Sequence, residues 1–210
     1  MILQKPPDAF CLYVLAHGAG AGMRHPFLQR LADALAEERV ATLRYEFPYM
    51  AEGRRRIDAV PVLHARVREA VAAGAAHGLP LFAGGKSFGG RMTSQAQAAA
   101  PLPSVLGLCF AGFPLHAAKR PAVERASHLR EIGIPMLFLQ GTRDDLAQLD
   151  LISGVIEELP DATLHVVEGA DHSFHVLKRS GRSDEQVLVE LAQAFARWAQ
   201  AISGERSSRM

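Results

Sequence analysis

The sequence predicts an α/β fold with a mostly parallel, doubly wound sheet of about six strands. Short apolar runs alternate with longer amphipathic segments, and the runs are almost unbroken, as in strands that are buried on both faces. The 210 residues, of which 49% are hydrophobic and 21% charged, fit a single domain over 1–210. No repeat or linker divides the chain, and the polar tail 203–210 is expected to fray.

The predicted strands are short runs rich in Val, Leu and Phe. The first reads FCLYVLA and the fourth reads VLGLCFA. Neither run alternates with polar residues, which indicates strands with both faces covered. Strands are expected over 10–16, 40–45, 79–84, 105–111, 136–140 and 162–167.

The predicted helices lie between these strands and carry apolar residues at helical spacing. Pro26 suits a first helical turn, and Gly78 and Pro101 each follow the end of a helix. Irregular structure is expected over 46–61 and 113–131, with a short helix near 123–130. Helices are expected over 26–39, 62–77, 89–100, 146–158 and 185–202.

Composition and charge exclude several classes of protein. A formal net charge of +1 offers nothing to a polyanion, so a dedicated nucleic-acid binder is not expected. No apolar stretch approaches the roughly 20 residues that a membrane-spanning helix requires. The run 10–16 is interpreted as a core strand rather than as a signal peptide, because Pro6 and Pro7 precede it. Cys11 and Cys109 lie in apolar runs, which favours buried thiols and a cytoplasmic protein.

A nucleophile motif lies between the third predicted strand and the helix that follows. Gly85-Lys86-Ser87-Phe88-Gly89 fits G-x-S-x-G, in which the serine occupies a strained strand-to-helix turn. Side chains at the two glycine positions would collide with that turn. The turn raises the hydroxyl of Ser87 above the carboxyl edge of the sheet, so Ser87 is the predicted nucleophile.

Candidate partners for this serine follow the last two predicted strands. A serine nucleophile needs a base and an acid, in the chain order Ser, Asp, His for this arrangement of strands. Asp144 is the predicted acid and His172 the predicted base. Asp171 stays open as an alternative acid, and Asp145 is expected to cap the following helix. The other histidines are expected on the surface or in packing.

The first predicted strand ends in the glycine-rich stretch HGAGAG. It lacks the G-K-[ST] ending of a phosphate-binding loop, so nucleotide binding is disfavoured. Its backbone N–H groups suit an oxyanion hole instead. We expect one donor from Ala19 or Gly20 and the second from Phe88. His17 is expected to brace this loop by hydrogen bonding.

These motifs together resemble the α/β-hydrolases, over residues 10–198. The closer resemblance is to small dienelactone-hydrolase-like proteins, a group related to the testis-expressed and NSL-complex hydrolase-like proteins. The resemblance implies Ser87 as nucleophile, Asp144 as acid and His172 as base, in a minimal fold without a cap domain. Dienelactone hydrolase itself uses a cysteine nucleophile, so its substrate does not carry over.

The sequence thus predicts a serine hydrolase of a small ester or thioester, with no metal or organic cofactor and no nucleic-acid or membrane partner. Two alternatives remain: an interaction module that keeps the fold without catalysis, and acyl transfer or perhydrolysis at the same triad. The oligomeric state is left open. Lys86, Arg24 and Arg143 are interpreted as surface charges rather than as a positive rim. The predicted substrate contacts are Met23, Phe47, Tyr49, Phe113 and Phe174.

Overall fold

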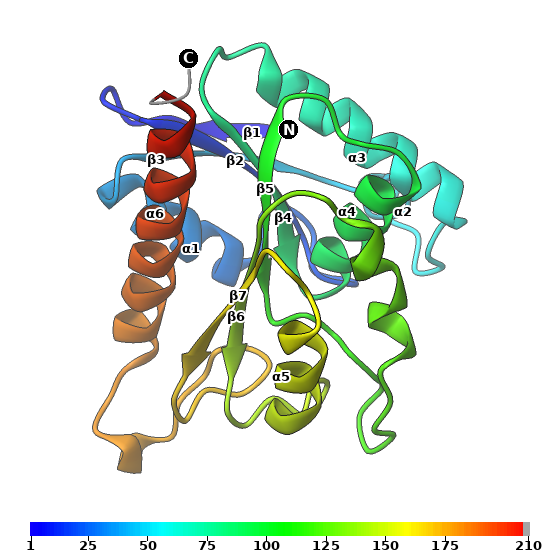
Figure 1. Cartoon of the computed structure of the whole chain (residues 1–210), viewed down its shortest axis with the longest axis vertical. Coiled ribbons are helices and arrows are strands. Elements are labelled where there is room, and N and C mark those ends of the chain that lie inside the picture. The colour runs from blue at the N-terminus through cyan, green and yellow to red at the C-terminus, as the bar shows by residue number, and fades with distance from the viewer. Residues whose placement is uncertain (208–210) are drawn as a thin grey trace.

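A computed structural model describes residues 1–207, with side chains up to residue 204. One seven-stranded sheet runs through it, in the order β1-β3-β2-β4-β5-β6-β7 (Figure 1). All neighbouring strands are parallel except β1, which pairs antiparallel with β3. The strands are β1 (Ile2–Gln4), β2 (Cys11–Ala16), β3 (Val40–Tyr45), β4 (Leu81–Lys86), β5 (Val105–Ala111), β6 (Met136–Gly141) and β7 (Ala162–Val167).

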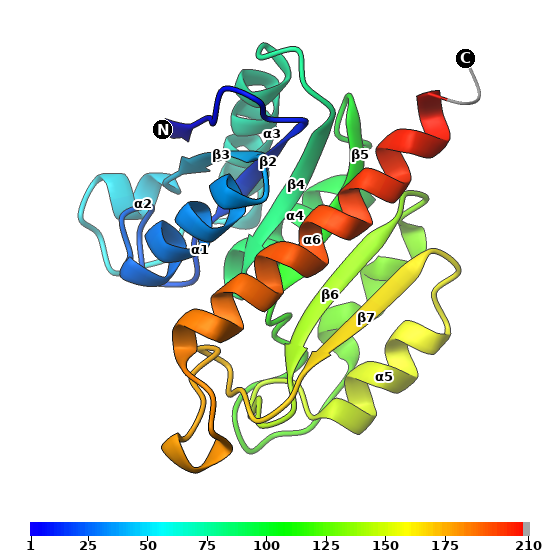
Figure 2. The ribbon, with the colours of Figure 1, turned by 90° about the vertical axis from the view of Figure 1, so that its left-hand side faces the viewer.

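Helices cover both faces of this sheet. In Figure 1, α1 and α6 lie on one side and α3, α4 and α5 on the other, and Figure 2 shows α6 crossing in front of the strands. The helices are α1 (Pro26–Glu37), α2 (Pro48–Ala51), α3 (Val60–Ala75), α4 (Phe88–Ala99), α5 (Leu149–Glu157) and α6 (Asp184–Ser207), with 3-10 turns η1 (Glu124–Glu131) and η2 (Lys178–Ser180). This arrangement confirms the predicted parallel α/β sheet.

The strand β2 shows how the alternation of side chains builds two cores. Leu12 and Val14 pack in the cluster that includes the apolar residues of α3 and α4. Tyr13 and Leu15 point to the opposite face and pack with α1 and α6. Because both faces are covered, all six residues of β2 are buried.

The order of the strands determines where a site can form. From β2 the chain passes to β3 on one side, and from β3 it returns past β2 to β4 on the other side, so the order of strands reverses between β2 and β4. At the carboxyl ends of these two strands, Ala16 lies opposite Gly85. Ligands of open α/β sheets bind at such a switch point. The loop after β2 and the turn after β4 therefore border the expected site.

Several predicted boundaries differ from the structure. β1 was not predicted, and α2 lies inside a stretch that was expected to be irregular. The helix expected from residue 146 begins at Leu149, and the short helix near 123–130 is the 3-10 turn η1. Residues 203–207 belong to α6 rather than to a frayed tail, and 208–210 lie outside the described residues.

The absence of a cap domain was predicted and is confirmed. In the described chain, the connection from β5 to β6 holds no helix other than η1. The sheet's carboxyl edge is therefore covered by loops rather than by a helical lid. No helix among residues 1–207 is long and apolar enough to cross a membrane.

Candidate active site

Ser87 occupies the turn between β4 and α4. Its backbone has φ 49° and ψ −116°, a strained conformation for a residue with a side chain. The turn packs tightly against the end of β2: a Cβ on Gly85, in β4, would lie 2.5 Å from the carbonyl oxygen of Ala16. A Cβ on Gly89 would lie 2.4 Å from the carbonyl oxygen of His17. The glycines of the motif therefore permit a close approach that holds Ser87 at the sheet edge.

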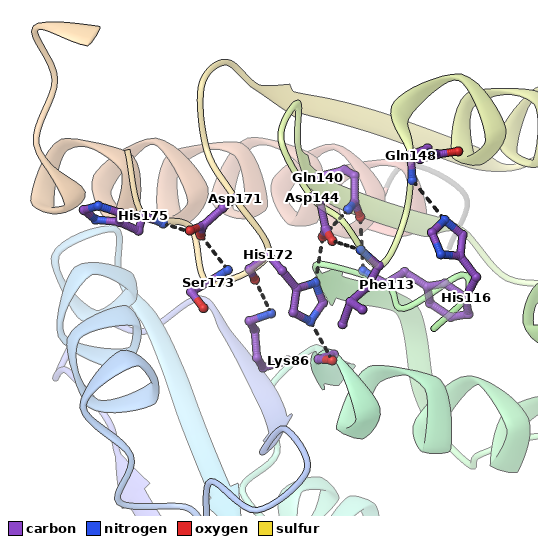
Figure 3. A network of polar contacts seen from close by, with 12 residues as sticks. Lys86, Phe113, His116, Gln140, Asp144, Gln148, Asp171, His172, Ser173 and His175 are labelled. Atoms are coloured by element: carbon purple, nitrogen blue, oxygen red, sulfur yellow. Dashed lines mark hydrogen bonds and ion pairs between the residues drawn. The ribbon is translucent and has the colours of Figure 1, made fainter. Parts of the chain in front are cut away.

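His172 joins this serine to a buried carboxylate. Its Nε2 lies 2.9 Å from Ser87 Oγ. Its Nδ1 lies 2.7 Å from Asp144 Oδ2 (Figure 3). A carboxylate only accepts, so Nδ1 carries the proton and Nε2 is free to accept from the serine hydroxyl. This tautomer is the one that a general base for Ser87 requires.

Asp144 is held in place by two donors besides the histidine. Gln140 Nε2 donates to Oδ2 at 2.5 Å, and the amide of Leu146 donates to Oδ1 at 2.8 Å. Gln140 is itself fixed, because its Oε1 accepts from the amide of Phe113 at 3.1 Å. Asp144 is 4% exposed, so its carboxylate depends on these donors. This role of Gln140 was not predicted, because the residue ends a predicted strand and belongs to no motif.

The two acidic residues next to the relay in the sequence, Asp171 and Asp145, have other roles. Asp171 Oδ1 accepts from the amides of Ser173 and His175 and so shapes the loop rather than orienting the imidazole. Asp145 is exposed and does not cap α5, whose N-cap is Gln148. The expected cap at Asp145 was wrong because the chain makes a further turn before the helix begins.

A second serine–histidine pair lies between α4 and η1. Ser94 Oγ is 2.7 Å from His128 Nε2, but its hydroxyl donates to the carbonyl oxygen of Arg91. Ser94 is fully buried. Burial, with Arg91 and His64 nearby, lowers the pKa of His128 to about 4. Among the described residues no carboxylate orients the ring of His128, so this pair has neither a third member nor access to a substrate.

The glycine-rich loop after β2 is braced by His17, as expected. Its Nδ1 donates to the carbonyl oxygen of Gly18 at 2.7 Å, and its Nε2 accepts from the amide of Phe47 at 3.1 Å. Burial lowers the pKa of His17, which favours the neutral ring that both contacts require. The amide of Gly20 donates to the hydroxyl of Tyr49 at 3.3 Å. Within the described chain, the amide of Ala19 has no protein acceptor.

A pocket of about 350 Å³ opens beside Ser87 and His172. The five predicted substrate contacts do not line it. Four of them, Phe47, Tyr49, Phe113 and Phe174, are at most 2% exposed and pack in the two cores, and Met23 is half-buried outside the lining. The pocket is lined by Gly18, Ala19, Ala21, His25, Phe27, Leu28, Lys86, Ser87, Leu146, His172 and Ser173.

The fold agrees with comparisons to known proteins. The profile of the alpha/beta hydrolase domain family matches residues 10–200, and the chain belongs to this family. An alpha-beta serine hydrolase homologue from Coxiella burnetii is 20% identical with a TM-score of 0.69, over 93% of this chain and 89% of the other. A dienelactone hydrolase from Anabaena variabilis is 22% identical with a TM-score of 0.69, over 93% of this chain and 88% of the other. An a/b serine hydrolase without lid from Xanthomonas campestris is 21% identical with a TM-score of 0.67, over 95% of this chain and 86% of the other. At these identities the likeness concerns the fold, and it agrees with the predicted resemblance.

Proposed function

We propose that the protein is a serine hydrolase of small esters or thioesters. The observation that carries the proposal is the continuous chain of hydrogen bonds from Ser87 Oγ through His172 to Asp144. A relay of this kind serves to activate a serine, and a protein that used the fold only as an interaction module would have no need of it. The two buried free thiols, Cys11 and Cys109, favour a cytoplasmic location for the enzyme.

In the proposed reaction, Ser87 Oγ attacks the carbonyl carbon while His172 Nε2 takes the hydroxyl proton. The imidazolium is stabilised through Nδ1–H by Asp144. Collapse of the tetrahedral intermediate breaks the bond to the leaving group, which receives the proton from Nε2. Water then attacks the acyl-enzyme with the same base and releases the acid and Ser87.

The negative charge of the tetrahedral intermediate needs donors that are already oriented. We assign them to the amides of Phe88, at the start of α4, and of Ala19. Ala19 is preferred to Gly20 because the amide of Gly20 already donates a hydrogen bond to the hydroxyl of Tyr49. Each such donor contributes a few kcal/mol to stabilisation of the transition state.

The test combines labelling by a fluorophosphonate with turnover of p-nitrophenyl butyrate. The protein is expected to label and to hydrolyse the ester, and Ser87→Ala is expected to lose both while its free energy of unfolding changes by less than about 1 kcal/mol. Ser94→Ala removes the hydroxyl of the second serine–histidine pair and is the matched control, which should keep both. Labelling that survives in Ser87→Ala would overturn the assignment. A wild-type protein that neither labels nor hydrolyses would favour the interaction module.

A further inference from the structure

One cation lies inside the pocket described above. Lys86 ends β4 directly before Ser87, and its side chain passes within 3.7 Å of the position that a Cβ on Gly18 would take. The ammonium donates to the carbonyl oxygen of His172 at 2.6 Å (Figure 3). Lys86 thus lies alongside the relay, and it belongs to the lining of the pocket.

The surroundings of this ammonium leave its charge without a partner. It lies 5.9 Å from the ring centre of Phe27 and 5.5 Å from that of Phe174. Among the described residues, no carboxylate lies within 4.0 Å of it. The nearby acids are committed elsewhere: Asp144 to His172 and its two donors, Asp171 to the amides of its own loop.

This arrangement is unfavourable for the protein alone. An ammonium has three N–H donors, and the carbonyl of His172 takes one. The neighbouring walls of the pocket, Phe27, Leu28 and Leu146, are apolar and replace water without replacing its hydrogen bonds. Burial accordingly lowers the pKa of Lys86 to about 8, against the raising influence of Asp144 and Asp171. A desolvated, unpaired charge in a pocket beside a relay indicates a ligand of opposite charge.

We propose that Lys86 determines specificity by binding a carboxylate group of the ester substrate. The inference rests on the proposed function and names its substrate class: small esters that also carry a free carboxylate. The two unused N–H donors of Lys86 form charge-assisted hydrogen bonds to that carboxylate while Ser87 attacks the ester carbonyl. The aromatic rings of Phe27 and Phe174 hold the ammonium over the pocket rather than in solvent.

The test compares two esters that differ only at the end of the acyl chain, mono-p-nitrophenyl adipate and p-nitrophenyl hexanoate. We expect kcat/KM to be higher for the adipate monoester, and the ratio to fall roughly tenfold or more in Lys86→Met. Lys86→Arg keeps the charge and should keep part of the preference. Lys178→Met removes an exposed lysine on η2 and should leave the ratio unchanged.

The ratio separates specificity from a merely structural role. If Lys86 only holds the loop of His172 through the carbonyl contact, Lys86→Met slows both esters equally and the ratio stays the same, which overturns the proposal. The proposal is also overturned if the wild-type protein hydrolyses p-nitrophenyl hexanoate but prefers the carboxylate-bearing ester neither in this pair nor in the second pair described next. That result would leave the proposed function intact. A second pair, 4-carboxyphenyl and 4-carbamoylphenyl hexanoate, tells whether the carboxylate belongs to the acid or to the alcohol.

The dependence of the same ratio on pH gives a readout that needs no variant. Lys86 is charged below its pKa of about 8, so the preference for the anionic ester should be full below that pH and decline as the pH rises through it. The titratable groups around Lys86 are Asp144, Asp171 and His172, and His25 lines the same pocket. Because both esters meet these same groups, titration of the groups should largely cancel in the ratio of the two kcat/KM values. In Lys86→Met the change of this ratio near pH 8 should vanish. A step that persists in Lys86→Met would assign the preference to another group.

Discussion

The orientation of the His172 imidazole depends on the carboxylate of Asp144, which hydrogen bonds hold in place. Asp144 receives hydrogen bonds from His172, Gln140 and Leu146, and its Oδ2 fixes the proton of the histidine on Nδ1. Any change that turns this acceptor into a donor reverses the tautomer of the ring. His172 Nε2 then carries the proton and cannot accept from Ser87.

Asp144→Asn is therefore expected to lower kcat on p-nitrophenyl butyrate by several orders of magnitude, since the corresponding change in a serine protease costs about 10⁴-fold. Asp171→Asn is the matched control. Its side-chain oxygen can still accept from the amides of Ser173 and His175, so kcat should change little. If Asp171→Asn proves to be the damaging change, the acid of the proposed mechanism is wrongly assigned.

The three members of the relay could be named from the sequence, but the pocket could not. Ser87 has a motif, and Asp144 and His172 follow strands in a fixed order, so each left a signal in the sequence. The predicted contacts Phe47 and Phe113 are apolar residues in loops, where no periodicity tells a core side chain from a pocket wall. Gln140 also left no signal, because a polar residue at the end of a strand has many ordinary reasons to be there.

The close contact between α4 and β2 allows a prediction about the effect of glycine substitutions on stability. Gly89 and Gly154 both lie in helices, where alanine is intrinsically favoured by about 0.5–1 kcal/mol. A Cβ at Gly154 would meet nothing within 4 Å, whereas at Gly89 it would lie 2.4 Å from the backbone oxygen of His17. The atoms that this Cβ would meet belong mainly to the backbone of Ala16 and His17, which cannot move aside as the end of a flexible side chain can.

We expect Gly89→Ala to lower the free energy of unfolding by about 3 kcal/mol or more, and Gly154→Ala to raise it by up to about 1 kcal/mol. Urea denaturation followed by circular dichroism measures both, with an unchanged m-value as the check on two-state behaviour. Equal stabilities of the two variants would mean that α4 does not pack this closely against β2.

The elements that could be predicted are those with a strong periodic pattern. The six longer strands are apolar runs, and that signal was enough to find them. β1 has three residues and only partly buried side chains, and α2 has four residues, too few to display a period. The predicted start of α5 was three residues too early. The amide of Leu146 donates to the side chain of Asp144, and the chain makes a further turn before the helix begins at Leu149.

Because the described chain has no cap over the pocket, we expect the protein to prefer short acyl chains. The pocket of about 350 Å³ is bounded by loops and by α1, and no helical lid covers it in the described chain. Each buried methylene contributes about 0.8 kcal/mol only while there is wall to cover it. Across p-nitrophenyl esters from acetate to laurate, kcat/KM should rise over the first few carbons and then level off or fall.

Two further features of the same series check this expectation. The rate should show no jump when the ester forms micelles, because there is no lid to open at an interface. A preference for chains of roughly twelve carbons or more would require an apolar tunnel beyond the pocket, and the open site described here would be wrong.

The position of α6 has a consequence for how the chain is made. Phe195 of α6 packs on Tyr13 of β2 and on Phe82 of β4, with ring centres 4.7 and 5.7 Å apart. At about 5–20 residues per second on the ribosome, Tyr13 emerges on the order of 10–40 seconds before Phe195. During that time only α1 covers this face of the sheet (Figure 1), and the apolar side chains that α6 buries stay exposed. His172 is translated only shortly before Phe195. Until α6 is made, the nascent chain therefore exposes apolar surface to other chains, and for most of that time it also lacks the histidine of the relay.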